Sequence, residues 1–187
     1  MKRIAIGTVA PVVSGGRYPA KAVVGEHLPV RATVWREGHD AVAATVVWRG
    51  PDNHRNRIAR MAPDGVDTDA FVATVVPDTP GMWTYRVDAW GDPWTTWRRG
   101  VEAKVAAGQG TADLAVDLIV GADLLERAAQ GLDGADRGAL LDAASTLRNT
   151  SLPLVVRLAA VAGHAVRSVM YEHPVRDLVT RGETHRV

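Results

Sequence analysis

Apolar residues recur with two different periods in this sequence, and the change between them constrains the fold more than any other feature. Before Gly108, short segments such as residues 28–36 and 83–89 alternate apolar and polar side chains. A period of two is typical of half-buried strands. After Gly108, apolar residues follow the spacing of an amphipathic helix. The sequence therefore predicts an α+β fold in which a β domain precedes a helical domain.

The first part of the chain, residues 1–107, is predicted to be an immunoglobulin-like β-sandwich. Roughly seven or eight short strands alternate with turn signals, which is the pattern of two packed antiparallel sheets. Residues 82–99 hold four of the six tryptophans and are interpreted as a hairpin. Its corner is predicted at residues 91–93, because proline lacks an N–H and glycine tolerates positive φ. The second arm is expected to continue as a strand to Ala106.

Residues 108–187 are predicted to form a three- to four-helix bundle. Apolar stripes indicate three helices, which begin near residues 113, 136 and 151. The third is expected to end before Pro174, because the residue before proline avoids the α region. Residues 175–180 are expected to add a short helical turn, followed by a polar end without regular structure. Three helices make a thin bundle, so a fourth partner is expected, either the sandwich or another subunit.

The composition excludes several classes of function. The formal net charge of the 187 residues is +1, so no global field draws the protein to nucleic acid or to a membrane surface. No segment approaches the roughly 20 apolar residues of a transmembrane helix. Cysteine is absent, which excludes disulfides and thiolate chemistry and is compatible with a reducing compartment. Because the start of the chain lacks the apolar core of a signal peptide, the protein is expected to be cytoplasmic.

No catalytic, cofactor-binding or metal-binding residue is predicted. His39 lies between Glu37 and Asp40, but a polar turn explains these residues, and no second cluster has the spacing of metal ligands. Asp88 and Asp92 are close in sequence, and glycoside hydrolysis uses a pair of carboxylates. They are interpreted as a strand residue and a turn residue, because nothing in the sequence indicates an acid–base environment around them.

The tryptophans allow two interpretations. An exposed indole ring can stack on a sugar, and Trp94 and Trp97 are the best candidates because they flank the predicted corner. Large aromatic side chains mainly occupy cores and interfaces, however. Trp94 and Trp97 are therefore predicted to make either a glucan contact or a contact between domains, and packing is the favoured interpretation.

Three segments resemble one enzyme family, in the same order along the chain. Residues 19–42 read PAKAVVGEHLPVRATVWREGHDAV, residues 84–99 read TYRVDAWGDPWTTWRR, and residues 172–180 read EHPVRDLVT. They resemble motifs in the N-terminal region of the α-1,4-glucan:maltose-1-phosphate maltosyltransferases (GlgE type), which are members of glycoside hydrolase family 13. The resemblance covers nearly the whole chain. Arg99 departs from it, because the family often has histidine at that position.

The resemblance implies a role for the full-length protein. Such an enzyme is expected to transfer a maltosyl unit from α-maltose 1-phosphate to an α-1,4-glucan and to release phosphate, without a cofactor. Its catalytic residues are expected on a (β/α)8 barrel C-terminal to this chain, so none is carried over. The chain is then a fragment, the β-sandwich N domain plus the helical S insert, which packs against the barrel and is inactive alone.

The fragment itself is predicted to have a structural role in a homodimer. Three amphipathic helices carry more apolar side chains than one thin layer buries, and covering them favours association. The predicted interface residues are Leu114, Leu118, Leu125, Leu154, Leu158 and Val161. Two alternatives remain open. The stripe is buried wholly against the chain's own sandwich, or the fragment is an autonomous α-glucan-binding module that uses exposed tryptophans.

Overall fold

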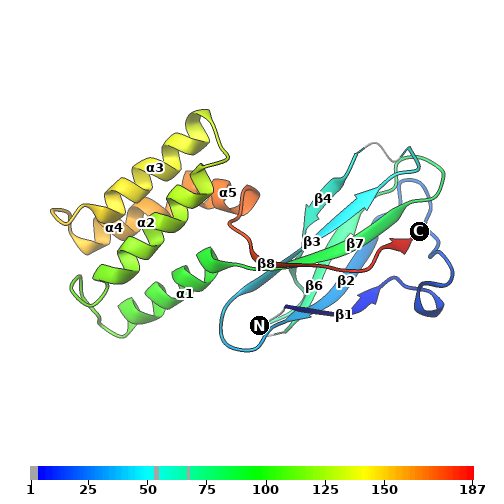
Figure 1. Ribbon diagram of the computed structural model, residues 1–187, viewed down its shortest axis with the longest axis horizontal. Helices are drawn as coiled ribbons and strands as arrows, with labels where there is room; N and C mark the ends of the chain where they lie inside the picture. The colour runs from blue at the N-terminus through cyan, green and yellow to red at the C-terminus, as the bar shows by residue number, and fades with distance from the viewer. Residues whose placement is uncertain (1–3, 53–54, 67) are drawn as a thin grey trace. The chain divides into compact units, whose positions relative to one another are not determined.

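Two units make up the structure, and one is inserted into the sequence of the other. The computed structural model describes residues 4–52, 55–66 and 68–187; residues 1–3, on which the predicted absence of a signal peptide partly rests, lie outside this description. The first unit comprises Met1–Gly91 and Asp177–Val187, and the second is Asp92–Arg176. The first consists of strands and the second of helices (Figure 1). The predicted α+β class is confirmed.

Two antiparallel sheets form the first unit. One has the strand order β1 (Ala5–Ala10), β2 (Leu28–Trp35), β6 (Ala70–Val75) and β5 (Ala62–Pro63). The other has the order β4 (Arg57–Arg60), β3 (Val42–Arg49), β7 (Thr84–Gly91) and β8 (Asp177–Arg181), and β9 (His185–Arg186) also pairs with β7. A short 3-10 turn, η1 (Ser14–Gly16), follows β1. When β1 to β8 are lettered A, B, C, C′, D, E, F and G along the chain, the two sheets read A-B-E-D and C′-C-F-G. This is the arrangement of an immunoglobulin-type sandwich.

The core of the sandwich follows the alternation in the sequence. Along β2, Val30 and Val34 are fully buried, whereas the residues on either side of them are more exposed. Val46 of β3 and Val87 of β7 are also fully buried and belong to the same core cluster. Burying one such side chain contributes about 1.5–3 kcal/mol. In β2 this one-sided burial is the physical reason why alternation predicted the strand.

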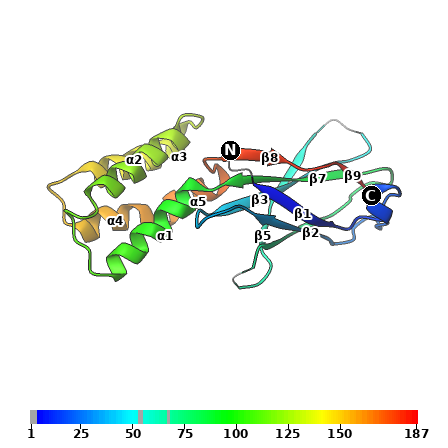
Figure 2. The same ribbon diagram turned by 60° about the horizontal axis from the view of Figure 1, so that its bottom comes forward.

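Helices form the whole of the second unit, as Figure 2 shows from another side. They are α1 (Pro93–Ala106), α2 (Ala115–Ala129), α3 (Gly134–Arg148), α4 (Leu154–Ala162) and α5 (His164–Glu172). Gly163 has an extended backbone conformation and divides the predicted third helix into α4 and α5, which are bent by 50° at this point. Among the described residues, each helix taken singly is too short or too polar to cross a membrane.

The predicted second arm of the tryptophan hairpin is wrong, because Pro93–Ala106 is helix α1. Asp92 is the N-cap of this helix. Its carboxylate accepts hydrogen bonds from the backbone N–H and the hydroxyl of Thr95, both at 2.9 Å. Pro93 follows in the first turn, where its missing N–H has no helical partner to lose. The Asp-Pro pair therefore starts a helix instead of turning a hairpin.

Helix α1 supplies the partner that the thin bundle requires. Trp94, Trp97 and Val101 lie on its buried face and join the core cluster of the other helices. The change from strand to helix consequently occurs after Gly91. The predicted domain boundary at Gly108 lies after the C-terminal end of α1, whereas the boundary in the structure precedes this helix. The bundle is completed by residues that alternation assigned to the sandwich.

The end of the chain returns to the sandwich. Asp177–Arg181 forms β8, so the helical turn predicted for residues 175–180 is wrong, and the polar end also contributes β9. Asp177 is the cross-strand partner of Gly91. The two ends of the helical segment are therefore joined to the sandwich at Gly91 and Asp177, which are paired residues of neighbouring strands. β8 and β9 form because β7 offers backbone N–H and C=O groups as hydrogen-bond partners. No local pattern within β8 indicates this pairing.

Candidate functional site

Trp94 and Trp97 lie side by side on the inner face of α1. Their rings stack with centroids 4.8 Å apart and 22° between the ring planes. The residues are only 6% and 7% exposed, and the Trp97 indole N–H donates a 2.6 Å hydrogen bond to the backbone carbonyl of Asp117. A sugar requires an exposed ring face, so the predicted glucan contact is not available to either residue. The predicted contact between domains stays a prediction.

The six apolar residues predicted for the dimer interface belong to the core of the helical unit. Leu114, Leu118 and Leu125 have no exposed surface, and Val161 is 5% exposed. The other two, Leu154 and Leu158, are partly buried against the same core. A partner subunit cannot reach the fully buried Leu114, Leu118 and Leu125, which are core residues. An interface role for the partly buried Leu154 and Leu158 stays a prediction. The chain buries its own apolar stripe, and it does so among its helices.

The acidic residues considered for catalysis have structural partners. Asp88 accepts hydrogen bonds from Nε and Nη2 of Arg86 at 2.8 and 3.1 Å. Asp92 caps α1, and Asp40 forms a 2.7 Å ion pair with Arg36. Within the described residues, no group of three or more His, Cys, Asp or Glu side chains could hold a metal ion. These carboxylates hold the fold together and give no support for a catalytic site.

Three groups in the sandwich have shifted pKa values, and each shift has a structural cause. Burial raises the pKa of the Tyr85 phenol to about 12. The hydrogen bond to Asp88 raises the pKa of the Arg86 guanidinium. A hydrogen bond from Arg57 lowers the pKa of the Asp78 carboxyl. Ion pairing and packing explain all three shifts, so none of them indicates an acid or base that works on a substrate.

Helix α2 carries an exposed apolar stripe on the side away from its buried face. Val116, Ile119 and Val120 are 72%, 51% and 44% exposed. They are spaced three and four residues apart, so they share one face of the helix. Val155 and Val156 of α4 are exposed as well. These five side chains are accessible apolar groups that a partner could cover, unlike the buried leucines of the same unit.

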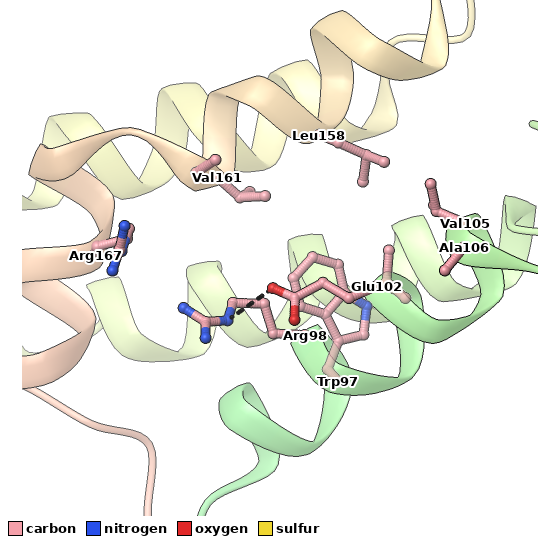
Figure 3. A pocket seen from close by; sticks show the side chains of 10 residues that line it. Trp97, Arg98, Glu102, Val105, Ala106, Leu158, Val161 and Arg167 are labelled. Carbon is pink, nitrogen blue, oxygen red and sulfur yellow. Dashed lines mark ion pairs between the residues drawn. The ribbon is translucent and has the colours of Figure 1, made fainter.

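A pocket of about 540 Å³ opens between α1 and the α4–α5 pair (Figure 3). Its apolar walls come from both sides and include Trp97, Val101, Leu158 and Val161. Its charged lining residues are Arg98, Glu102 and Arg167. The sequence pattern did not indicate this pocket, because one of its walls, α1, was predicted to be a strand. The spacing of Trp97, Val101 and Val105 by four residues was the available signal of a helical face.

Arg157 is a further residue that the sequence analysis missed. It is 3% exposed, and its Nε donates a 2.7 Å hydrogen bond to the backbone carbonyl of Leu147, to which Nη2 also donates. Leu147 lies in the last turn of α3, where carbonyls have no partner within the helix. Arg157 therefore caps α3 from the next helix. Its signal was a lone charge within the apolar run of residues 154–162.

Comparison with known proteins gives a consistent result over the whole chain. Residues 2–187 match the family model described as "Alpha-1,4-glucan:maltose-1-phosphate maltosyltransferase, domain N/S". The protein of that enzyme name from Mycolicibacterium smegmatis is 46% identical over 99% of this chain and 30% of its own length. Maltosyltransferase 2 of Streptomyces coelicolor is 46% identical over 97% of this chain and 27% of its own length.

A more distant relative gives the same picture. The maltosyltransferase of Arcanobacterium haemolyticum is 32% identical over 100% of this chain and 27% of its own length. The chain thus spans less than a third of the length of these curated relatives. The similarity includes both units of the structure, the sandwich and the helices inserted into it.

Proposed function

Because the chain belongs to the α-1,4-glucan:maltose-1-phosphate maltosyltransferase family, as its N/S domain, we propose that it is the non-catalytic N-terminal region of such an enzyme. The match over residues 2–187, together with the chain's small share of each relative, carries the proposal. The full-length enzyme would transfer maltosyl units from α-maltose 1-phosphate to α-1,4-glucan in α-glucan biosynthesis. The absence of cysteine is compatible with a cytoplasmic location.

The structural partners of the acidic residues support a non-catalytic role. Asp88 and Asp92, the carboxylates considered for glycosyl transfer, are 7% and 4% exposed and engaged in hydrogen bonds. A glycosyl transfer site instead needs two carboxylates that face a shared substrate cleft. We accordingly propose that the catalytic barrel lies in the remainder of the full-length enzyme and that this chain packs against it.

Phosphate release tests this role directly. The purified chain, incubated with α-maltose 1-phosphate and an α-1,4-glucan, is expected to release no phosphate above a blank without protein. A protein that includes the segment C-terminal to Val187 is expected to release phosphate under the same conditions. Turnover by the 187-residue chain alone would contradict the proposal.

A second part of the proposal is that the chain takes part in a homodimer through the exposed stripe of α2. Val116, Ile119 and Val120 offer a continuous helical face, and covering their remaining exposed surface contributes roughly 25 cal/mol for each Å² of apolar area. In a two-fold dimer every such contact occurs twice. Asp123 and Arg127 continue the same face and supply polar groups for the rim of the contact.

Sedimentation equilibrium tests the dimer with matched variants. The wild-type chain is expected to exceed the 20.0 kDa of a monomer at high micromolar concentration. Ile119→Lys is expected to weaken association at least tenfold, because it places a charge in the apolar contact. Val66→Lys is the control, since Val66 is 88% exposed on the sandwich. A wild-type chain that stays at 20.0 kDa, or equal effects of both variants, would refute this dimer.

The residues predicted for the alternative function, autonomous glucan binding, are not exposed. With Trp94 and Trp97 buried, the exposed tryptophan of the sandwich is Trp35, at 47%. Affinity electrophoresis in a gel that contains soluble α-glucan separates the two functions. We expect no retardation of the chain, whereas retardation that Trp35→Ala abolishes would favour the binding module.

A further inference from the structure

The pocket of the helical unit has one apolar end and one cationic end. Figure 3 shows Leu158 and Val105 together at one end. The guanidinium groups of Arg98 and Arg167 lie at the other end, beside Val161. One arginine comes from α1 and the other from α5, so the two helices place the charges from opposite sides. This separation of an apolar part from a charged part is the form of a site for an amphiphile.

The positive charge at this end is only partly neutralised. Arg98 has Glu102 as its ion-pair partner, but Nε and Oε1 are 3.5 Å apart, and the buried Nε has no hydrogen bond. Among the described residues, the Arg167 side chain has neither a hydrogen bond nor an ion pair. Two arginines and one glutamate leave a net charge of +1 in the lining. A ligand with a single negative charge would neutralise it.

A carboxylate fits this end. The planar guanidinium presents N–H donors that match the two oxygens of a carboxylate. An unpaired buried N–H is costly, which gives the Arg98 side chain a reason to reorient towards an anion.

The apolar end selects against a sugar. Its side chains, such as Leu158 and Val105, offer no hydrogen-bond partner to hydroxyl groups, which would lose their water without replacement. An aliphatic chain gains about 0.8 kcal/mol for each methylene it buries. The volume of about 540 Å³ lies within the usual range for small-molecule sites. The ligand is therefore an amphiphile and not a substrate of glucan chemistry.

We propose that the pocket between α1 and the α4–α5 pair binds a free amphiphilic carboxylate, such as a medium-chain fatty acid. Arg98 and Arg167 hold the carboxylate, and Leu158, Val105 and Val101 cover the aliphatic chain. All of these residues belong to the helical unit, so the site is complete within this chain. The proposal is independent of the maltosyltransferase role and of the α2 stripe.

Isothermal titration calorimetry of the 187-residue chain with sodium decanoate, below micelle-forming concentration, tests the proposal. We expect saturable binding of one decanoate per chain. Each methylene removed from the probe weakens binding about fourfold, from the transfer free energy of one methylene. Decanol, which has the same chain and no charge, is expected to bind at least tenfold more weakly.

Variants at the cationic end separate this site from adventitious binding. Arg98→Gln and Arg167→Gln are each expected to weaken decanoate binding at least fivefold. Arg137→Gln on α3 is the control, since Arg137 is exposed and does not line the pocket. Ala162→Leu narrows the pocket and is expected to weaken binding without a change in helical ellipticity. All four proteins are compared with the wild-type chain at matched concentration.

Several results would overturn the proposal. One is the absence of saturable decanoate binding, and another is equal affinity for decanol. A third is the same affinity in the two pocket arginine variants and in Arg137→Gln.

Discussion

Replacing Gly121 of α2 by alanine tests the packing of the helical core. A Cβ atom built on Gly121 lies 2.5 Å from Cε2 and 2.9 Å from Cη2 of Trp97, far closer than van der Waals contact. The indole cannot easily move away. It stacks on Trp94, with centroids 4.8 Å apart, and its N–H is hydrogen-bonded to the Asp117 carbonyl. Gly121→Ala must therefore displace either the ring or the helix.

The expected size of the effect follows from opposing contributions. Alanine in place of glycine in a helix interior stabilises by about 1 kcal/mol. Overpacking costs about 1–3 kcal/mol, and loss of the indole hydrogen bond adds about 1 kcal/mol. The net loss is about 2 kcal/mol, which lowers the melting temperature of a unit of this size by roughly 10 °C. Gly100 of α1 is the matched control, because its Cβ would meet nothing within 4 Å.

Thermal and urea unfolding, followed by ellipticity at 222 nm, measures both variants. Gly121→Ala is expected to melt below the wild-type chain and Gly100→Ala slightly above it. In a Trp97→Leu background, Gly121→Ala is expected to become neutral or stabilising, because the steric conflict is removed. If Gly121→Ala is as stable as the wild-type chain, or destabilises equally in both backgrounds, the proposed packing of α1 on α2 is refuted.

Three further perturbations test other parts of the structure. Deleting Asp92–Arg176 and joining Gly91 to Asp177 by a short turn is expected to leave a folded β protein, because these residues are cross-strand partners; residual helical ellipticity or an unfolded chain would contradict this. Burial raises the pKa of Tyr85 from 10.0 to about 12, so the stability that its proton provides is present below pH 10 and lost as the pH rises to 12. Tyr85→Phe is expected to flatten this part of the pH profile of urea midpoints, and an unchanged slope would argue against it. Arg157→Met is expected to destabilise the helical unit by about 1.5–3 kcal/mol in urea unfolding, because the α3 carbonyl loses its donors; wild-type stability would show that the cap contributes nothing.

Local pattern alone was sufficient for much of the fold. The strands β3 and β6 follow from short runs of strand-forming residues that turn residues end. The strands β2 and β7 follow from alternation, and the helices α2 and α3 follow from apolar stripes at helical spacing. Both patterns exist because an element with one buried face must repeat its apolar residues at its own structural period. The sandwich class followed in turn from the number of short strands and the turns between them.

Helix α1 shows where a local pattern is ambiguous. Residues 94–99 can be written as two alternating faces, yet Trp94, Trp97 and Val101 are also spaced as one face of a helix. The cap decides between the two. Asp92 followed by Pro93 is a helix start as well as a turn, and only the first use satisfies the free N–H groups of the residues that follow. Giving the cap more weight than the alternation would have corrected the prediction.

The sequence by itself determined the periods, the turns and the family motifs, because each is written in residues close together along the chain. Only the tertiary structure decided that Trp94 and Leu118 are core residues, that β8 pairs with β7, and that a charged pocket separates α1 from α5. Exposure and pairing depend on surfaces supplied by distant segments. A stripe of apolar residues shows that a helix has a buried face, but it does not show whether its own chain or a partner covers that face.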